Sequence, residues 1–331
     1  MRVAINGFGR IGRTLGRLLA QQSDIQWVAV NDLMDEANME HLLKYDSVHR
    51  TFPGHIEQKD NYLKVNDQFP QIFHEANPED LPWDTLNVDV VIECTGRFRS
   101  KEAASAHLRA GAKKVILSAP ATDKETKTLV LGINDDILTA DDLIISNASC
   151  TTNSAAPMVK IVEDHWGIEQ GYITTVHSYT GDQRLHDAPH KDLRRARAGA
   201  LNIVPTTTGA AKAITRIFPH LEGKLGGCGI RVPVPDGSLT DITFTLKNKT
   251  TVEEVNKVFE SYANGSMKNI LQVTYDPIVS VDILGSPYSC IFDAELTSVI
   301  GSMLKIVGWY DNEAGYSNRL MDLLKKLQQF Q

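Results

Sequence analysis

The stretch that decides the fold is Val3 to Gly12, which reads VAINGFGRIG. Val3 to Ile5 is a short apolar run with β-branched residues, which predicts a strand. The chain then turns at Asn6-Gly7, and apolar residues follow at helical spacing, at Ile11, Leu15 and Leu19. A strand, a glycine turn and a helix in this order predict the start of a doubly wound α/β domain.

The glycines of this stretch, Gly7, Gly9 and Gly12, form the GxGxxG pattern of dinucleotide-binding domains, and Asp32 follows about 20 residues later. The glycines allow a tight turn and let the backbone approach a pyrophosphate at the helix N-terminus. Asp32 would accept hydrogen bonds from ribose hydroxyls and repel a 2′-phosphate, so NAD is predicted rather than NADP. The alternative is a glycine turn that packs a helix on a strand without a ligand.

Length and composition are typical of a two-domain globular protein. At 331 residues the chain exceeds the size at which one core normally stops growing. Its net charge of -7 disfavours a nucleic acid or an acidic membrane as partner. The four cysteines form no CxxC pair, and we find no signal peptide and no long apolar run. These features predict a cytoplasmic protein without a metal site.

Hydrophobic patterning divides the chain near residue 150. Short apolar runs at 88–92, 115–117 and 143–145, with a helical segment at 101–110, favour a parallel sheet covered on both faces. Alternation at 172–178 and 238–247 indicates antiparallel strands, and 251–263 and 316–327 resemble amphipathic helices. We therefore predict an α/β Rossmann domain, doubly wound with a mostly parallel sheet, at 1–149. An α+β domain with a mostly antiparallel sheet is predicted to follow at 150–314.

Cys150 is a candidate nucleophile because it lies between a predicted strand and a predicted helix that reaches about His165. A helix N-terminus lowers the pKa of a thiol, and its N–H groups can receive an oxyanion. Pro157 should either kink the helix or move its first turn downstream. The alternative is that Cys150 is an inert, buried small residue.

The residues alone do not determine which side chains act together with Cys150. His177 could be a general base, but the chain has ten histidines. The basic segment 190–197 could bind a substrate phosphate through its arginines, or could be a solvated loop or a subunit contact. The Thr206–Gly209 segment could cradle a second anion or simply cap the helix predicted at Ala210 to Ile217.

Taken together, these stretches resemble the phosphorylating glyceraldehyde-3-phosphate dehydrogenases nearly end to end. The matching motifs, in order, are Ile5–Arg13, Ser146–Asn153, His177–Arg184, His190–Ala198, Pro205–Ala213, Arg231–Ser238 and Trp309–Ser317. The resemblance implies an NAD-binding first domain, completed by a C-terminal helix at 315–331, and a catalytic second domain. It also implies a homotetramer.

The resemblance assigns roles to residues that match its motifs. Cys150 would be the nucleophile and His177 the base that activates it. Thr180 and Arg194 would belong to the site for the C3 phosphate of the substrate, with Arg231 between the two phosphate sites. The residues implied to hold inorganic phosphate are Ser149, Thr151, Thr208 and Gly209. Besides the three glycines, the implied cofactor contacts are Arg10, Ile11, Asp32, Ser118 and Asn312.

The implied reaction is the oxidation of glyceraldehyde 3-phosphate, with inorganic phosphate, to 1,3-bisphosphoglycerate, a step of glycolysis and gluconeogenesis. The thiolate attacks the aldehyde, hydride passes to the nicotinamide, and phosphate resolves the thioester. A thioester keeps acyl-transfer energy that a free carboxylate would lose.

Three residues depart from the family pattern. Ser154 replaces a common second cysteine, which removes any thiol exchange with Cys150. Ala314 replaces a bulky residue, which puts the packing near Asn312 in doubt. Ala188 stands where NAD-specific relatives commonly have leucine, so tolerance of NADP is less excluded.

Other readings remain in competition. Erythrose-4-phosphate dehydrogenase shares the cysteine chemistry but tends to depart from the motifs at His177 and Pro205. A reductase of acyl phosphates, such as aspartate-semialdehyde dehydrogenase, should not reproduce the ordered set. A catalytically idle NAD-binding or RNA-binding protein would not need Cys150 and His177, and the acidic pI argues against a dedicated nucleic-acid role.

Overall fold

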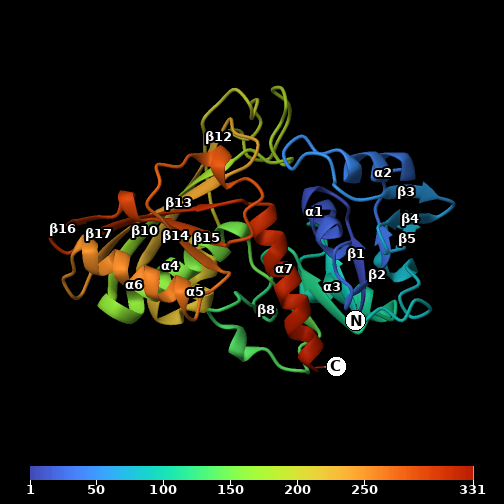
Figure 1. Ribbon diagram of the computed structural model, residues 1–331, viewed down its shortest axis with the longest axis horizontal. Helices are drawn as coiled ribbons and strands as arrows, with labels where there is room; N and C mark the ends of the chain where they lie inside the picture. The colour runs from blue at the N-terminus through green and yellow to red at the C-terminus, as the bar shows by residue number, and fades with distance from the viewer. Residues whose placement is uncertain (331) are drawn as a thin grey trace. The chain divides into compact units, whose positions relative to one another are not determined.

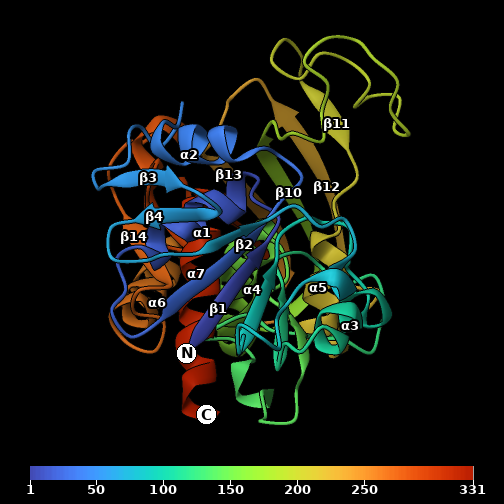
Figure 2. The ribbon, with the colours of Figure 1, turned by 90° about the vertical axis from the view of Figure 1, so that its right-hand side faces the viewer.

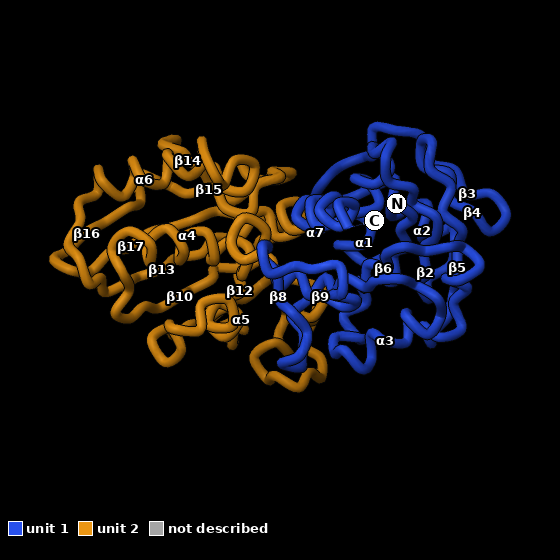
Figure 3. Tube along the Cα trace, turned by 90° about the horizontal axis from the view of Figure 1, so that it is seen from below, with its two compact units in different colours: residues 1–129, 135–149, 317–331 blue, residues 130–134, 150–316 orange. Residues whose placement is uncertain are grey.

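A computed structural model describes residues 1–330 (Figures 1 and 2), and the chain divides into two compact units (Figure 3). Unit 1 comprises Met1–Leu129, Asp135–Ser149 and Ser317–Gln331. Unit 2 comprises Val130–Asn134 and Cys150–Tyr316. Among the residues described, no helix combines the length and the apolar character that crossing a membrane requires.

Unit 1 contains, within the described residues, a nine-stranded sheet in the order β3-β4-β5-β2-β1-β6-β7-β9-β8. Its strands are β1 (Arg2–Asn6), β2 (Gln26–Asn31), β3 (Ile56–Lys59), β4 (Tyr62–Val65), β5 (Gln71–Phe73), β6 (Val90–Glu93), β7 (Lys114–Leu117), β8 (Lys127–Thr128) and β9 (Ile144–Ser146). The strands from β5 to β8 in this order pair in parallel, while β4 is antiparallel to both β3 and β5. The prediction of a mostly parallel sheet is confirmed.

Helices cover both faces of this sheet, which is why the middle residues of its central strands are apolar. The helices of unit 1 are α1 (Arg10–Leu19), α2 (Glu36–Lys44) and α3 (Lys101–Arg109), and α7 (Ala314–Leu327) starts in unit 2 and continues in unit 1. Figure 3 shows α1 and α7 on one side of the strands and α3 on the other. Val91 and Ile92 of β6 are both fully buried as a result.

The glycine turn needs its glycines for steric reasons. Gly7 has a φ of 96°, and a Cβ there would lie 2.5 Å from the backbone nitrogen of Thr95. A Cβ on Gly12 would lie 2.1 Å from the carbonyl oxygen of Gly7, so α1 packs directly on the turn. At Gly9, by contrast, no heavy atom lies within 4 Å of the Cβ position. Of the three glycines in this turn, only Gly9 therefore has free space at its Cβ position.

Unit 2 contains, as far as residue 316, an eight-stranded sheet ordered β11-β12-β10-β13-β17-β15-β14, with β16 paired to β17. Its strands are β10 (Ile168–Ser178), β11 (Val204–Thr206), β12 (Leu225–Val232), β13 (Ser238–Leu246), β14 (Leu271–Thr274), β15 (Cys290–Asp293), β16 (Ser298–Ile300) and β17 (Met303–Tyr310). The sheet is mostly antiparallel, as predicted, but β10 is parallel to β12 and β14 is parallel to β15. Alternation along one strand reports its wetter face and not the direction of its neighbour.

The helices of unit 2 are α4 (Cys150–Trp166), α5 (Ala210–Ile217) and α6 (Val252–Asn264). Helix α4 packs against β10, β13, β15 and β17. It begins at Cys150 and continues through Pro157, so the proline does not move the first turn downstream. Thr251 caps α6: its hydroxyl accepts from the N–H of Glu254 at 3.2 Å, and the Glu254 carboxylate accepts from the N–H of Thr251.

Candidate active site

A sharp turn brings the chain from β9 into α4 and places Cys150 at the first position of that helix. Ala148 makes this turn with a φ of 56°, in the left-handed region, and is fully buried. Its N–H donates to the hydroxyl of Ser146 at 3.1 Å. A left-handed alanine costs about 1 kcal/mol, a strain that the surrounding packing has to offset. Alanine gives no sequence signal for such a conformation.

His177, at the end of β10, lies next to Cys150. The Nε2 atom of His177 is 3.5 Å from the Cys150 Sγ atom. Its Nδ1 atom is 2.8 Å from the carbonyl oxygen of Ser178. In the tautomer protonated at Nδ1, this N–H donates to that carbonyl, and Nε2 can accept the thiol proton. The tertiary structure thus places His177, which the family resemblance implies as the base, next to the thiol.

Arg231 completes this cluster from the neighbouring strand β12, where it is in register with His177. Its guanidinium contacts Nδ1 of His177 and donates to the Ser178 carbonyl at 3.0 Å. Burial, followed by the positive charge of Arg231, lowers the pKa of His177 to about 3. The imidazole is therefore neutral near pH 7, as a base must be.

The pKa of Cys150 does not follow the helix-terminus expectation. Burial raises the pKa of the thiol above its ordinary value, and this effect exceeds the opposing effects of the Arg231 charge and of the Thr151 N–H. The prediction of a lowered pKa was wrong. Removing water from the thiolate destabilises it by more than the nearby positive charge and hydrogen-bond donors stabilise it.

We expect Arg231→Gln to move the alkylation of Cys150 to higher pH. Removing the guanidinium charge destabilises the thiolate, so the pKa of the thiol should rise further, in the direction opposite to the present effect of Arg231. The measurement is the rate of iodoacetamide alkylation as a function of pH, without cofactor. Arg231→Lys keeps a positive charge and should shift the profile less. An unchanged or lower midpoint in Arg231→Gln would contradict this account.

Two residues of the Trp309–Ser317 motif, Tyr310 and Asn312, lie in unit 2, and the sequence predicted a role only for Asn312. Tyr310, which the sequence reasoning missed, is buried edge-on to His177, and its hydroxyl lies 2.9 Å from that of Thr151 and 2.8 Å from that of Thr175. The Oδ1 atom of Asn312 accepts from Ser178 at 2.8 Å and from Ser238 at 2.7 Å. Two serines thus fix the side chain of Asn312 within unit 2, although Ala314 replaces the bulky residue of the family pattern.

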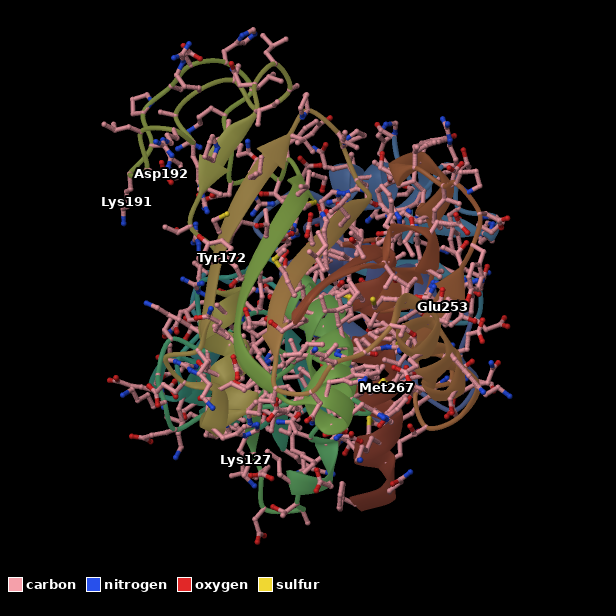
Figure 4. All side chains as sticks on the ribbon, turned by 90° about the vertical axis from the view of Figure 1, so that its left-hand side faces the viewer. Lys127, Tyr172, Lys191, Asp192, Glu253 and Met267 are labelled. Atoms are coloured by element: carbon pink, nitrogen blue, oxygen red, sulfur yellow. The ribbon has the colours of Figure 1, made fainter. Side chains whose placement is uncertain are left out.

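The segment 180–209 carries the other predicted phosphate residues. Thr180 lies two residues after the end of β10. At the start of α5, the hydroxyl of Thr208 accepts a hydrogen bond from the N–H of Ala210 at 3.2 Å. Arg194 is exposed and lines a hollow of about 400 Å³ with Thr206 and Thr207. Figure 4 shows the neighbouring Lys191 and Asp192 on the loops beyond the strands.

Arg195, next to the predicted Arg194, is the arginine of this segment whose charge reaches His177. Its guanidinium pairs with Asp182 at 2.7 Å and donates to the hydroxyl of Thr206 at 2.9 Å. Its charge also lowers the pKa of His177, after burial and Arg231. The sequence gave no means of choosing between adjacent arginines, because the direction of each side chain depends on the loop conformation.

A second hollow, of about 340 Å³, lies in unit 1 at the glycine turn. Its lining includes Gly7, Gly9, Asn31, Asp32 and Thr95. Helix α1 has no acidic residue in its own first turn, and Gly9 gives it no side-chain cap. This arrangement suits an anionic ligand.

Asp32 and Arg10, two predicted cofactor residues, already have partners in unit 1. The Asp32 carboxylate accepts from the N–H of Phe8 at 2.6 Å and of Met34 at 3.0 Å, so it also holds the glycine turn in place. Arg10 forms a bidentate pair with Asp46. Ile11 lies in the first turn of α1, Ser118 follows β7, and Ser149 precedes α4, the last two half-buried.

Comparison with known proteins gives the family. Residues 149–312 match the family model described as "Glyceraldehyde 3-phosphate dehydrogenase, C-terminal domain", and residues 1–101 match "Glyceraldehyde 3-phosphate dehydrogenase, NAD binding domain". The chain belongs to the glyceraldehyde-3-phosphate dehydrogenase family. Its first domain is therefore of the NAD-binding type, and the resemblance inferred from the motifs is confirmed.

Curated relatives agree over nearly the whole chain. Glyceraldehyde-3-phosphate dehydrogenase 1 of Streptomyces avermitilis is 54% identical over 325 residues, covering 98% of this chain and 97% of that protein. Glyceraldehyde-3-phosphate dehydrogenase of Mycobacterium tuberculosis is 52% identical over 331 residues, with the same coverage.

Two alanine substitutions separate the structural use of the glycines from their use in NAD binding. We expect Gly12→Ala to destabilise folding by about 1–3 kcal/mol, because its Cβ would overlap the Gly7 carbonyl. Gly9→Ala should cost less than about 1 kcal/mol, yet weaken NAD binding about tenfold, because its methyl group occupies the space open to the ligand. Thermal unfolding and calorimetric NAD titration measure both effects. Unchanged NAD affinity in Gly9→Ala would contradict a ligand at this turn.

Proposed function

We propose that this chain catalyses the NAD-dependent oxidation of D-glyceraldehyde 3-phosphate, with inorganic phosphate, to 1,3-bisphosphoglycerate. The observation that carries the proposal is the 3.5 Å separation between the Cys150 Sγ and His177 Nε2 atoms at the start of a helix. The high identity to proteins named for this activity supports the choice of substrate.

The proposed mechanism begins when the Cys150 sulfur adds to the aldehyde carbon. His177 passes the thiol proton to the carbonyl oxygen, and N–H groups at the start of α4 stabilise the charge that develops there. NAD, when bound, supplies the acceptor for the hydride that the carbon then loses. His177 takes the hydroxyl proton in the same step, which leaves a thioester on Cys150. Phosphate attacks the acyl carbon, the carbon–sulfur bond breaks, and the thiolate is released.

Two anion sites in an acidic protein would serve the last step. Thr180 and Arg194 would bind the C3 phosphate, and Arg231 would lie between the two phosphates. The residues proposed to hold inorganic phosphate are Ser149, Thr151, Thr208 and Gly209. The residues proposed to contact NAD are Gly7, Gly9, Arg10, Ile11, Gly12, Asp32, Ser118 and Asn312.

The functional domains proposed are 1–149 with 315–331 for NAD binding and 150–314 for catalysis. The division of the compact units after Ser149 and after Tyr316 supports these boundaries. We also propose a homotetramer in the cytoplasm without a dedicated nucleic-acid partner. Support for assembly comes from four apolar side chains of the segment 185–203 that are more than two thirds exposed, namely Leu185, Leu193, Leu201 and Ile203.

The decisive assay follows NADH formation from glyceraldehyde 3-phosphate with and without inorganic phosphate. We expect turnover only when phosphate or arsenate is present, because both resolve the thioester. A parallel assay offers erythrose 4-phosphate as substrate. Faster turnover of erythrose 4-phosphate, or a rate indifferent to phosphate, would overturn the proposal.

A further inference from the structure

A chain of buried hydrogen bonds runs beneath the hollow at the glycine turn. It links Trp83, His107 of α3, Glu93 at the end of β6, and Asn6 at the end of β1, all at most 2% exposed. The indole Nε1 of Trp83 is 3.0 Å from Nδ1 of His107. The Nε2 atom of His107 is 3.1 Å from Oε2 of Glu93, and Nδ2 of Asn6 is 2.6 Å from the same oxygen.

The chemistry of the two ends fixes the direction of this chain. An indole nitrogen can only donate, so Nδ1 of His107 must accept and carries no proton. In the neutral ring the proton is then on Nε2, which donates to Glu93. At the other end the backbone N–H of Thr95, which can also only donate, is 2.7 Å from Oε1 of Glu93. His107 is thus neutral and Glu93 is a carboxylate with donors at both oxygens, so the two do not form an ion pair.

The same carboxylate holds residues that line the hollow. Thr95 also donates to Glu93 through its hydroxyl, and that hydroxyl accepts from the N–H of Arg97 at 3.0 Å. Asn6, fixed by Glu93, accepts at Oδ1 from Asn31 at 2.7 Å. The four residues held in this way all line the 340 Å³ hollow, namely Asn6, Asn31, Thr95 and Arg97. Thr95 further defines the glycine turn, because its nitrogen occupies the space that a Cβ on Gly7 would need.

We propose that His107 and Glu93 are positioning residues for NAD, acting from beneath the binding surface. Glu93 fixes the carboxyl ends of β1 and β6 and, through Asn6, that of β2, and His107 fixes the carboxylate of Glu93 by donating from Nε2. This inference rests on the proposed NAD site but not on the proposed substrate. It assigns a function to two fully buried residues that the catalytic cluster does not use.

The first test compares NAD affinity in His107→Leu, His107→Gln and the unmodified protein by calorimetric titration. His107→Leu leaves the Trp83 N–H without its acceptor and removes one donor from Glu93, and we expect the dissociation constant for NAD to rise about tenfold or more. His107→Gln keeps an N–H able to reach Glu93 and should recover part of the affinity. His55→Gln, at an exposed histidine of the same unit, should leave the affinity unchanged.

The melting temperature without NAD and the alkylation rate of Cys150 are measured on the same variants. A purely structural role would lower the melting temperature and leave the NAD dissociation constant unchanged in both His107 variants, which would overturn the proposal. The alkylation rate should stay unchanged, since Cys150 belongs to the other unit. If NAD affinity falls as expected while glyceraldehyde 3-phosphate is not oxidised by the unmodified protein, the proposed function fails and this inference stands.

A second test needs no substitution. Nitrogen-15 NMR of the histidine-labelled, ligand-free protein reports the protonation of each ring nitrogen. His107 should give the shifts of a neutral ring protonated at Nε2. A proton on Nδ1, or a charged ring at neutral pH, would overturn the assigned direction of the hydrogen bonds.

Discussion

Cys150→Ser should lower turnover of glyceraldehyde 3-phosphate by about 10⁴-fold or more, while leaving NAD affinity unchanged. A serine hydroxyl stays protonated next to a neutral His177 and is a far weaker nucleophile than a thiolate. Loss of a nucleophile that acts together with its base typically removes most of the chemical rate enhancement. The measurement is steady-state NADH formation with saturating phosphate, together with an NAD titration.

The matched control is Cys228→Ser, at a half-buried cysteine on β12. It should retain turnover within about twofold, because serine is close to cysteine in size and the proposed mechanism gives Cys228 no role. Mass spectrometry after a single addition of substrate should show the acyl adduct on Cys150 and none on Cys228. A Cys150→Ser protein that keeps more than a tenth of the turnover would rule out the thioester mechanism.

His177→Asn should lower kcat by about 10²–10⁴-fold, the usual contribution of a positioned general base. Asparagine can still donate to the Ser178 carbonyl, so the end of β10 should keep its shape. It has no nitrogen at the position of Nε2, and the proton of the thiol then has no acceptor at 3.5 Å. Steady-state kinetics and the rate of Cys150 alkylation near neutral pH measure the two consequences.

His220→Asn is the control for this substitution, because His220 is exposed and pairs with Glu163 at 3.0 Å in the same unit. It should leave both rates within about twofold of the unmodified protein. Alkylation in His177→Asn that is as fast as in the control would show that Nε2 does not assist the thiol. In that case another group must accept its proton.

Local elements of the fold were predictable wherever short-range periodicity dictated them. The helix expected at Ala210 to Ile217 has those bounds, and the helix expected at 101–110 ends one residue earlier, at Arg109. The strand expected at 143–145 lies one residue later, at Ile144–Ser146. Of the two outcomes expected for Pro157, the helix start moved downstream does not occur, because buried packing along α4 keeps the helix continuous from Cys150 despite the lost N–H.

The candidate site was predictable only as far as its members are neighbours in the chain. Cys150 at a strand-to-helix turn follows from local pattern, but the left-handed Ala148 that makes the turn does not. The roles of His177 and Arg231 came from the family resemblance and not from the residues themselves. Tyr310 and Arg195 were missed, since nothing local distinguishes them from other tyrosines and arginines.

The sequence by itself determined the glycine turn that begins the first domain, the family, and the place of Cys150 between a strand and a helix, because each depends on residues close together in the chain. The family resemblance named His177, but only the tertiary structure gave its distance to the thiol, since His177 is 27 positions away and is held by the pairing of β10 with its neighbours. It also decided the protonation of the site, because desolvation and the charge of Arg231 act through space. The same holds for His107, whose neutral ring is set by an indole 24 positions away.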